Sequence, residues 1–288
     1  MLFSTTTDYL ERKYGLEGAV KMLIDAGFPA IDIFMFDTKM SVFSEDYKAT
    51  AKNILEIAKE KGVIFNQAHA PFGGPYEHYT EKLVPHFERA FEFASLVGVK
   101  TIVVHPVTKG AYLGREREHF EMNMEFYSSL IPLAKKTGVK IGIENMWGMH
   151  PVTKRIIDSV GSSPKELLLY YDTLNDPEAF TICLDIGHVA VCMREPEDAI
   201  RTLGDRIGAI HAHDVDYLHD SHTLPGVASL NWNNIARALA DIDYKGEFTL
   251  EADNFYCGFD DELIPTVARF MADVARNISS KIDFYRNK

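Results

Sequence analysis

The sequence has few cysteines, and they lie far apart. Cys183, Cys192 and Cys257 are the only three in 288 residues, and no two of them have the C-x-x-C spacing of a zinc knuckle. Such scattered thiols provide no disulfide framework, which suits a protein that works in a reducing compartment. We therefore expect a cytoplasmic protein.

Long hydrophobic runs and an excess of basic charge are also absent. No stretch approaches the roughly 18 apolar residues of a membrane-spanning helix, and the N-terminal residues MLFSTTTDYLERKYG lack the pattern of a secretion signal. The chain has 30 Lys+Arg against 42 Asp+Glu, a formal charge of −12, whereas nucleic-acid surfaces need clustered cations. The sequence thus predicts no membrane partner and no nucleic-acid partner.

What is present is a regular alternation of short apolar runs with longer amphipathic stretches. The runs predict eight strands and the stretches predict eight helices, so that each unit averages 288/8, or 36, residues. The expected strands are 2–6, 30–36, 63–69, 100–105, 139–144, 181–185, 208–211 and 248–251. The expected helices are 16–26, 47–61, 79–97, 115–136, 165–174, 196–203, 233–242 and 261–282.

This arithmetic is typical of an α/β protein folded as a single (β/α)8 TIM barrel. No Pro/Ser-rich linker divides the chain, so we predict one domain over residues 1–288. A doubly wound open sheet is the alternative, but no glycine-rich dinucleotide loop follows the first predicted strand.

Six consecutive predicted strands end in residue types that commonly bind metals in proteins. Because the carboxyl ends of barrel strands converge on the catalytic face, these side chains are expected to lie close together. Burying several carboxylates and imidazoles together is costly without a compensating cation, so a divalent metal is predicted there. The residues at the strand ends are His69, His105, Glu144, Asp185 with His188, His211 and Glu251.

Four of these residues form a mixed oxygen and nitrogen ligand set. Glu144, Asp185, His211 and Glu251 suit Mn²⁺, with Co²⁺, Mg²⁺ or Zn²⁺ as alternatives. Cys183 precedes Asp185 by two residues and is interpreted as a small residue of the barrel interior.

The ordered motifs HAP, VVHP, GIEN, LDIGH, HAHD, DSHTLPG and TLEAD resemble the xylose isomerase-like TIM-barrel superfamily. That superfamily includes sugar isomerases and epimerases and nucleases of the endonuclease IV type. The resemblance places a metal on the same four residues and His188 against substrate oxygens. The nuclease pattern has further metal ligands, and this sequence has residues of the matching types, which could bind further metal or substrate: His69, His105, Asp220 and His222.

Two departures from the family patterns limit the substrate assignment. Ketohexose 3-epimerases have a second glutamate and an arginine at the places held here by His150 and Tyr217. On the nuclease side, the segment FGGPYEHYTEKL does not resemble the DNA-contacting loop. A nuclease acting on abasic DNA therefore remains the weaker alternative.

The chemistry that the resemblance implies is proton abstraction next to a carbonyl, through a metal-stabilised enediolate, in a small carbohydrate or cyclitol, phosphorylated or not. Glu144 and Glu251 are the expected acid and base, and Phe72 and Trp147 are expected to stack on the substrate. The same enolate could expel a leaving group, so a dehydratase or lyase acting on a sugar, cyclitol or C-glycoside is the main alternative. The helical shell could also support a homo-oligomer.

Overall fold

The structure is a computed structural model that describes residues 1–288. Its strands follow short β-branched and apolar runs that are buried almost throughout, as expected of a parallel sheet covered by helices. The strands that form the barrel are β1 (Phe3–Thr5), β2 (Ala30–Phe34), β3 (Ile64–His69), β4 (Thr101–Val104), β5 (Lys140–Glu144), β8 (Phe180–Asp185), β9 (Ile207–His211) and β10 (Phe248–Leu250).

These strands form a closed parallel ring. Parallel ladders join β2, β3, β4, β5, β8 and β9 in that order, and a separate ladder joins β1 to β10. Two single parallel bridges close the ring, Thr6 with Asp32 between β1 and β2, and Ala212 with Leu250 between β9 and β10. The α/β TIM-barrel fold predicted from the sequence is confirmed.

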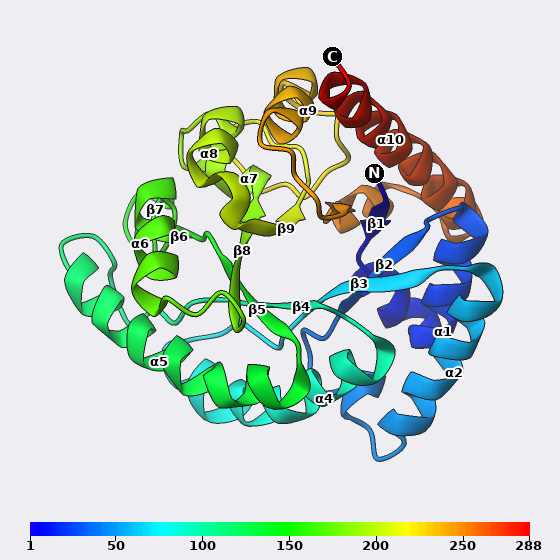
Figure 1. Cartoon of the computed structure of the whole chain (residues 1–288), viewed down its shortest axis with the longest axis horizontal. Coiled ribbons are helices and arrows are strands. Elements are labelled where there is room, and N and C mark those ends of the chain that lie inside the picture. Colours follow the sequence, from blue (N-terminus) through cyan, green and yellow to red (C-terminus); the bar gives the residue numbers. More distant parts are fainter.

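Helices surround the ring, as Figure 1 shows, and the chain goes once around the barrel from β1 to the C-terminal helix. A core of 73 buried hydrophobic residues packs the helices against the strands. None of the helices is long and apolar enough to cross a membrane. The helices are α1 (Asp8–Ala26), α2 (Tyr47–Lys61), α3 (Tyr76–His78), α4 (Phe87–Val97), α5 (Glu116–Thr137), α6 (Pro164–Leu174), α7 (Ile186–Val191), α8 (Pro196–Leu203), α9 (Trp232–Asp241) and α10 (Ile264–Arg286).

The segment 79–97, predicted as one helix, is the clearest error in the helix assignment. It begins as a π-helical turn (Tyr79–Leu83), continues as a 3₁₀ turn (Val84–His86) and becomes α-helical only at Phe87. Pro85 lies at the start of the 3₁₀ turn, and a proline nitrogen cannot donate the hydrogen bond that a continuous helix needs.

An antiparallel hairpin between β5 and β8 was not predicted. It consists of β6 (Trp147–Met149) and β7 (Ile156–Asp158) and lies outside the ring. Arg194, three residues after the end of α7, holds this hairpin by donating to both carboxylate oxygens of Asp158, at 2.6 and 2.8 Å. The hairpin thereby extends one wall beyond the carboxyl end of β5.

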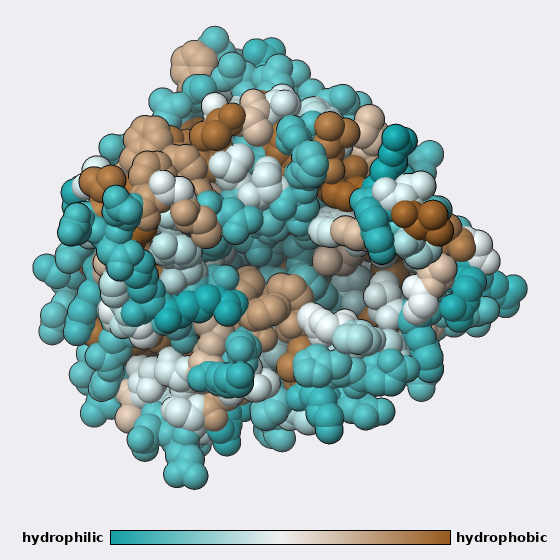
Figure 2. Space-filling view, turned by 180° about the vertical axis from the view of Figure 1, so that it is seen from behind, coloured by the Kyte–Doolittle hydropathy of each residue, from teal (hydrophilic) through white to brown (hydrophobic).

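The face turned away from the viewer in Figure 1 is hollowed at its centre. Figure 2 shows this face, with both hydrophilic and hydrophobic residues around the hollow.

Candidate functional site

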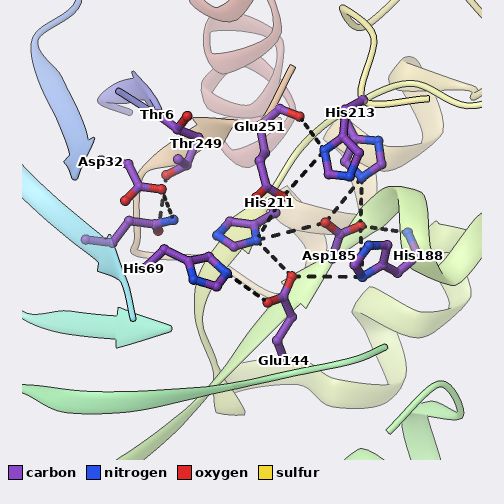
Figure 3. Close-up of polar contacts among 12 residues, drawn as sticks. Thr6, Asp32, His69, Glu144, Asp185, His188, His211, His213, Thr249 and Glu251 are labelled. Carbon is purple, nitrogen blue, oxygen red and sulfur yellow. Dashed lines mark hydrogen bonds and ion pairs between the residues drawn. The ribbon is translucent and has the colours of Figure 1, made fainter. Parts of the chain in front are cut away.

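The side chains that follow the barrel strands converge, as the sequence predicted. Glu144 ends β5, Asp185 ends β8, His211 ends β9 and Glu251 directly follows β10. All four are buried, and one ligand atom from each lies within 4.8 Å of the others. Figure 3 shows these four side chains pointing toward one another from different strands. We call them the central group.

His211 is the hub of the central group. Its Nδ1 lies 2.9 Å from Glu144 Oε1, 3.2 Å from Glu251 Oε2 and 3.9 Å from Asp185 Oδ2. The ion pairs of the three carboxylates are formed with histidines, and no lysine or arginine contacts them. The central group therefore concentrates negative charge that imidazoles alone offset.

Two further histidines lie on one side of the central group. His105 Nε2 is 2.8 Å and His69 Nε2 is 3.5 Å from Glu144 Oε2, and the two Nε2 atoms are 3.1 Å apart. His69 Nδ1 donates to the carbonyl of Ala70 at 3.0 Å, because a carbonyl oxygen can only accept. The Nε2 atom of His69 therefore faces Glu144, with the ring held from behind.

On the other side lies a second group of ligand types, which we call the outer group. It consists of His188, His213, Asp220 and His222, whose ligand atoms also lie within 4.8 Å of one another. Asp220 Oδ2 is 3.2 Å from His222 Nε2 and 3.5 Å from His188 Nε2. His213 Nε2 lies 3.1 Å from Asp185 Oδ1, so His213 connects the outer group to the central group.

Backbone carbonyls fix the orientation of two rings in the outer group. His188 Nδ1 donates to the carbonyl of Asn145 at 2.8 Å, and His222 Nδ1 donates to the carbonyl of Glu251 at 3.0 Å. Their Nε2 atoms are thereby presented to Asp220. A histidine that is held in this way through one nitrogen and free to bind through the other is typical of metal sites.

The charges of these groups shift one another's protonation equilibria. Burial raises the pKa of Glu144 and Glu251, but the positive charge of His211 and of other nearby histidines outweighs it and holds both carboxyl pKa values well below their usual range. Burial opposes the charged form of His222, but the hydrogen bond to Asp220 prevails and raises the pKa of His222 to about 10. The two glutamates thus favour the negative form, and His211 and His222 the positive form, whereas burial lowers the pKa of His105.

The central group fits a divalent cation. Metal bonds to oxygen and nitrogen are about 2.0 to 2.3 Å long, which places neighbouring ligand atoms roughly 3 to 4.5 Å apart. The distances of 2.9, 3.2 and 3.9 Å from His211 Nδ1 to the three carboxylates lie close to or within that range. Three buried carboxylates with no lysine or arginine partner also match the donor set that such an ion would neutralise.

The structure brings together the candidate site residues named from the sequence, whereas two further histidines, His150 and His219, make contacts of their own in the loops. Phe72 lies against His105, with ring centroids 3.9 Å apart, and Trp147 Nε1 donates to Asp220 Oδ2 at 2.8 Å. His150 instead accepts from the backbone N–H groups of Val152 and Thr153 in the hairpin. His219 is exposed and pairs with Asp216 at 2.9 Å. Cys183 lies in the barrel interior, as expected, in a small cluster with Val103 and Ala209.

Sequence analysis missed two residues that hold the site in place. The side chain of Asn145 accepts from the backbone N–H of Asp185 and donates to its carbonyl, which fixes the end of β8. Asp214 accepts from four backbone N–H groups and from Trp232 Nε1, and so shapes the long loop after β9. Asn145 is the last residue of the motif GIEN and Asp214 is the last residue of HAHD, so both motifs held the available signal.

Gly187 has a role that the sequence did not reveal. A Cβ atom at this position would lie 2.0 Å from Cε1 of His213, so only glycine leaves room for that imidazole. The glycine of LDIGH therefore allows His213 to approach Asp185.

Comparison with known proteins supports the architecture. A family model described as "Xylose isomerase-like TIM barrel" matches residues 20–274. The uncharacterized protein MJ1311 of Methanocaldococcus jannaschii is 25% identical over 85% of both chains. A D-psicose 3-epimerase of Enterocloster bolteae is 39% identical over 70 residues, 24% of this chain and 22% of that protein. The crystal structure of a D-tagatose 3-epimerase-like protein aligns with a TM-score of 0.74 at 21% identity, covering 98% of this chain and all of the other (100%).

Proposed function

The chain belongs to the xylose isomerase-like TIM-barrel family, and we propose that it is a metal-dependent sugar isomerase or epimerase. The observation that carries this proposal is the central group, in which two glutamates from different strands share one buried site with Asp185 and His211. The names of the E. bolteae relative and of the structural neighbour point to the same class of reaction.

We propose that Glu144, Asp185, His211 and Glu251 hold the metal, and that it is Mn²⁺, with Co²⁺, Mg²⁺ or Zn²⁺ as alternatives. Three carboxylates and one imidazole form an oxygen-rich ligand set, which favours such ions over thiophilic ones. When bound, the cation supplies Lewis-acid stabilisation of the negative charge that develops on the substrate oxygens.

The two glutamates would perform the proton transfers. Glu144 extends from β5 and Glu251 from the end of β10, so their carboxylates approach the bound substrate from different strands. One would remove the proton from the carbon next to the carbonyl, and the other would return a proton. Return to the opposite face of the same carbon gives an epimer, whereas return to the neighbouring carbon gives an isomer.

The remaining residues would bind and orient the substrate. His188, held by the Asn145 carbonyl, would contact a substrate oxygen through Nε2, and Phe72 and Trp147 would cover the apolar face of the sugar. His69 and His105 on one side, and Asp220 and His222 on the other, would bind further substrate oxygens or additional metal. The scattered thiols support a cytoplasmic location, and the helical shell would allow a homo-oligomer.

Turnover in D₂O tests this proposal. Mn²⁺-loaded protein is incubated with a panel of free and phosphorylated ketoses, inososes and keto-glycosides, and products are followed by NMR. The proposal predicts an isomeric product of unchanged composition, with solvent deuterium at the carbon next to the carbonyl. If no substrate in the panel gives a product with deuterium at that carbon, the proposal is contradicted.

The matched variants are Glu251→Gln and Glu247→Gln, because the two glutamates lie beyond opposite ends of β10. The first is expected to lose turnover and the second to keep it. Equal turnover in both would reject Glu251 as a catalytic residue.

A lyase or dehydratase is the second candidate, and the outer group is the observation that favours it. Imidazoles oriented toward the site, such as those of His188 and His222, could protonate a departing hydroxyl or aglycone. Mass spectrometry separates the two candidates, since dehydration lowers the product mass by one water whereas isomerisation conserves it.

A further inference from the structure

A cavity of about 220 Å³ opens beside the central group, between three neighbouring barrel loops. Phe72 comes from the loop after β3, His105 directly follows β4, and Trp147 begins β6 just after β5. Because β3, β4 and β5 are adjacent in the ring, His105 lies between the two aromatic side chains. His105 Nε2 also contacts Glu144 at 2.8 Å, so the cavity adjoins the central group.

The aromatic walls of the cavity are held rigidly. Phe72 packs against His69 and against Phe36, with ring centroids 4.6 and 4.7 Å apart, in addition to its contact with His105. Trp147 is tied to the outer group by its hydrogen bond to Asp220. Such fixed rings offer flat apolar surfaces of the kind that pack on the C–H faces of a carbohydrate ring.

The backbone turn after Phe72 also depends on its sequence. Gly73 and Gly74 have φ values of 112° and 76°, in the region that favours glycine, and a Cβ at Gly74 would lie 2.7 Å from His78. Gly73, Gly74 and Tyr76 also line the cavity, so this turn forms the part of its wall next to the Phe72 ring.

The polar lining of the cavity carries no formal charge. Its lining residues with polar side chains are His105, Thr108, Ser159, Tyr76 and Tyr79, and no aspartate, glutamate, lysine or arginine lines it. Binding sites for phosphate esters ordinarily supply arginine, lysine or a helix N-terminus to the phosphate. The cavity is therefore suited to hydroxyl groups and poorly suited to a phosphate.

The size of the cavity limits what can enter it. Sites for drug-sized ligands have volumes of about 300 to 1,000 Å³. At about 220 Å³ this cavity is smaller, so it matches a single ring, and the rest of any larger substrate would extend out of its open side.

We propose that this cavity holds one uncharged, hydroxylated ring of the substrate between Phe72 and Trp147, so that the enzyme acts on a neutral cyclic carbohydrate and not on a sugar phosphate. The inference rests on the proposed function, because it assigns the substrate class of that same site. The reacting carbonyl would face Glu144, and the rest of the ring would lie against the aromatic walls.

Ligand-observed NMR titration of the Mn²⁺-loaded protein tests this inference without requiring turnover. The probes are methyl β-D-glucopyranoside and myo-inositol as neutral rings, and glucose 6-phosphate as the charged counterpart. We expect at least one neutral ring to bind about tenfold more tightly than the phosphate ester. Replacing the aromatic wall by Phe72→Leu, which keeps a hydrophobic side chain, should weaken that binding severalfold to about tenfold.

The matched control is Phe259→Leu, since Phe259 lies in the loop after β10, away from the cavity, and its substitution should leave the affinity unchanged. A second control concerns Lys109, a cation beside the cavity wall, whose Nζ lies 4.8 Å from the centroid of the Tyr76 ring. If glucose 6-phosphate binds more tightly than the neutral rings and Lys109→Met removes that preference, the inference is overturned.

The inference is also overturned if no neutral ring binds, or if Phe72→Leu leaves the affinity unchanged. These outcomes are distinct from failure of the proposed function. Binding of a neutral ring with no turnover of any sugar would contradict the proposed function and leave the cavity assignment intact. Turnover restricted to phosphorylated sugars would support the reaction class and contradict the cavity assignment.

Discussion

Two glutamates at opposite ends of the same strand have opposite electrostatic environments. Glu251, after the carboxyl end of β10, faces His211 and His222, and despite burial these histidines hold its pKa below the usual range. Glu247, before the amino end of β10, has no ionic partner, and burial raises its pKa. At the carboxyl end of the strand the surroundings therefore favour the ionised form of a glutamate, whereas at the amino end burial disfavours it.

The comparison of the two glutamates shows where the protein concentrates charge. At the carboxyl end, buried carboxylates and imidazoles are gathered in numbers that a folded chain rarely tolerates without a ligand. Further toward the amino end, the interior holds neutral hydrogen bonds, such as Ser4 to Thr249 at 2.8 Å and Asn66 to Thr249 at 3.1 Å. One end is built for chemistry and the other for stability, as is usual in this architecture.

The largest expected effect comes from exchanging the two glutamates for glutamine. Glu251→Gln should lower kcat by about 10³-fold, within the range for loss of a general acid or base, because an amide cannot carry the proton. Glu247→Gln should leave kcat within about twofold. The measurement is steady-state turnover at saturating Mn²⁺, with metal content determined in parallel. Similar losses in the two variants would remove the distinction between the ends.

A pair of glycines provides the next comparison. Gly187→Ala places a methyl group 2.0 Å from the His213 ring, whereas Gly208→Ala, at the amino end of β9, places one 2.2 Å from Thr181 Oγ1. We expect Gly187→Ala to lower activity by about 10- to 100-fold, as for displaced groups around metal ligands. Gly208→Ala should instead lower the free energy of unfolding by roughly 1 to 3 kcal/mol and leave turnover per folded molecule unchanged.

Thermal unfolding and turnover, measured on both glycine variants, check this pair. Full activity of Gly187→Ala would show that His213 has no part in the site.

The smallest effect concerns the pH dependence of stability. A carboxyl group whose pKa is raised by folding contributes stability at low pH, and this contribution is lost as the pH rises through the raised value. Burial raises the pKa of Glu247, so wild-type protein should lose stability relative to Glu247→Gln as the pH rises above about 4, the value near which an ordinary glutamate ionises. Denaturant unfolding at pH 4 and pH 8 measures the free energy of unfolding of both proteins. If Glu247→Gln is less stable than wild type at pH 8 but not at pH 4, the predicted direction of the pH dependence is wrong.

Much of this architecture could be predicted from the sequence because strand ends and chemistry coincide in a barrel. The apolar run of the motif GIEN predicts both β5 and the position of Glu144 at its end. The run of the motif TLEAD likewise predicts β10 and the position of Glu251. A side chain at the end of a parallel strand has its position set by the sheet, so its neighbours follow from the fold.

What the sequence did not predict are contacts that no local pattern encodes. The hydrogen bond from Trp147 to Asp220 joins a hairpin to a loop 73 residues later, and Gly187 matters only through the ring of His213. Likewise, the 3.6-residue periodicity of the segment 79–97 does not distinguish a π turn from an α-helix, so the break before Phe87 was not predicted.

The most direct test of the central claim is the metal content of the protein. Wild-type chain, loaded with Mn²⁺ and passed through a desalting column, is analysed by inductively coupled plasma mass spectrometry beside Asp185→Asn and Asp176→Asn. Asp185 ends β8 in the central group, whereas Asp176 precedes the amino end of the same strand and pairs with Lys135 at 2.7 Å. We predict at least one tightly bound ion per chain in wild type and in Asp176→Asn, with loss of that ion in Asp185→Asn. Wild-type protein that retains no ion, or an Asp185→Asn variant that retains as much as wild type, would contradict the account.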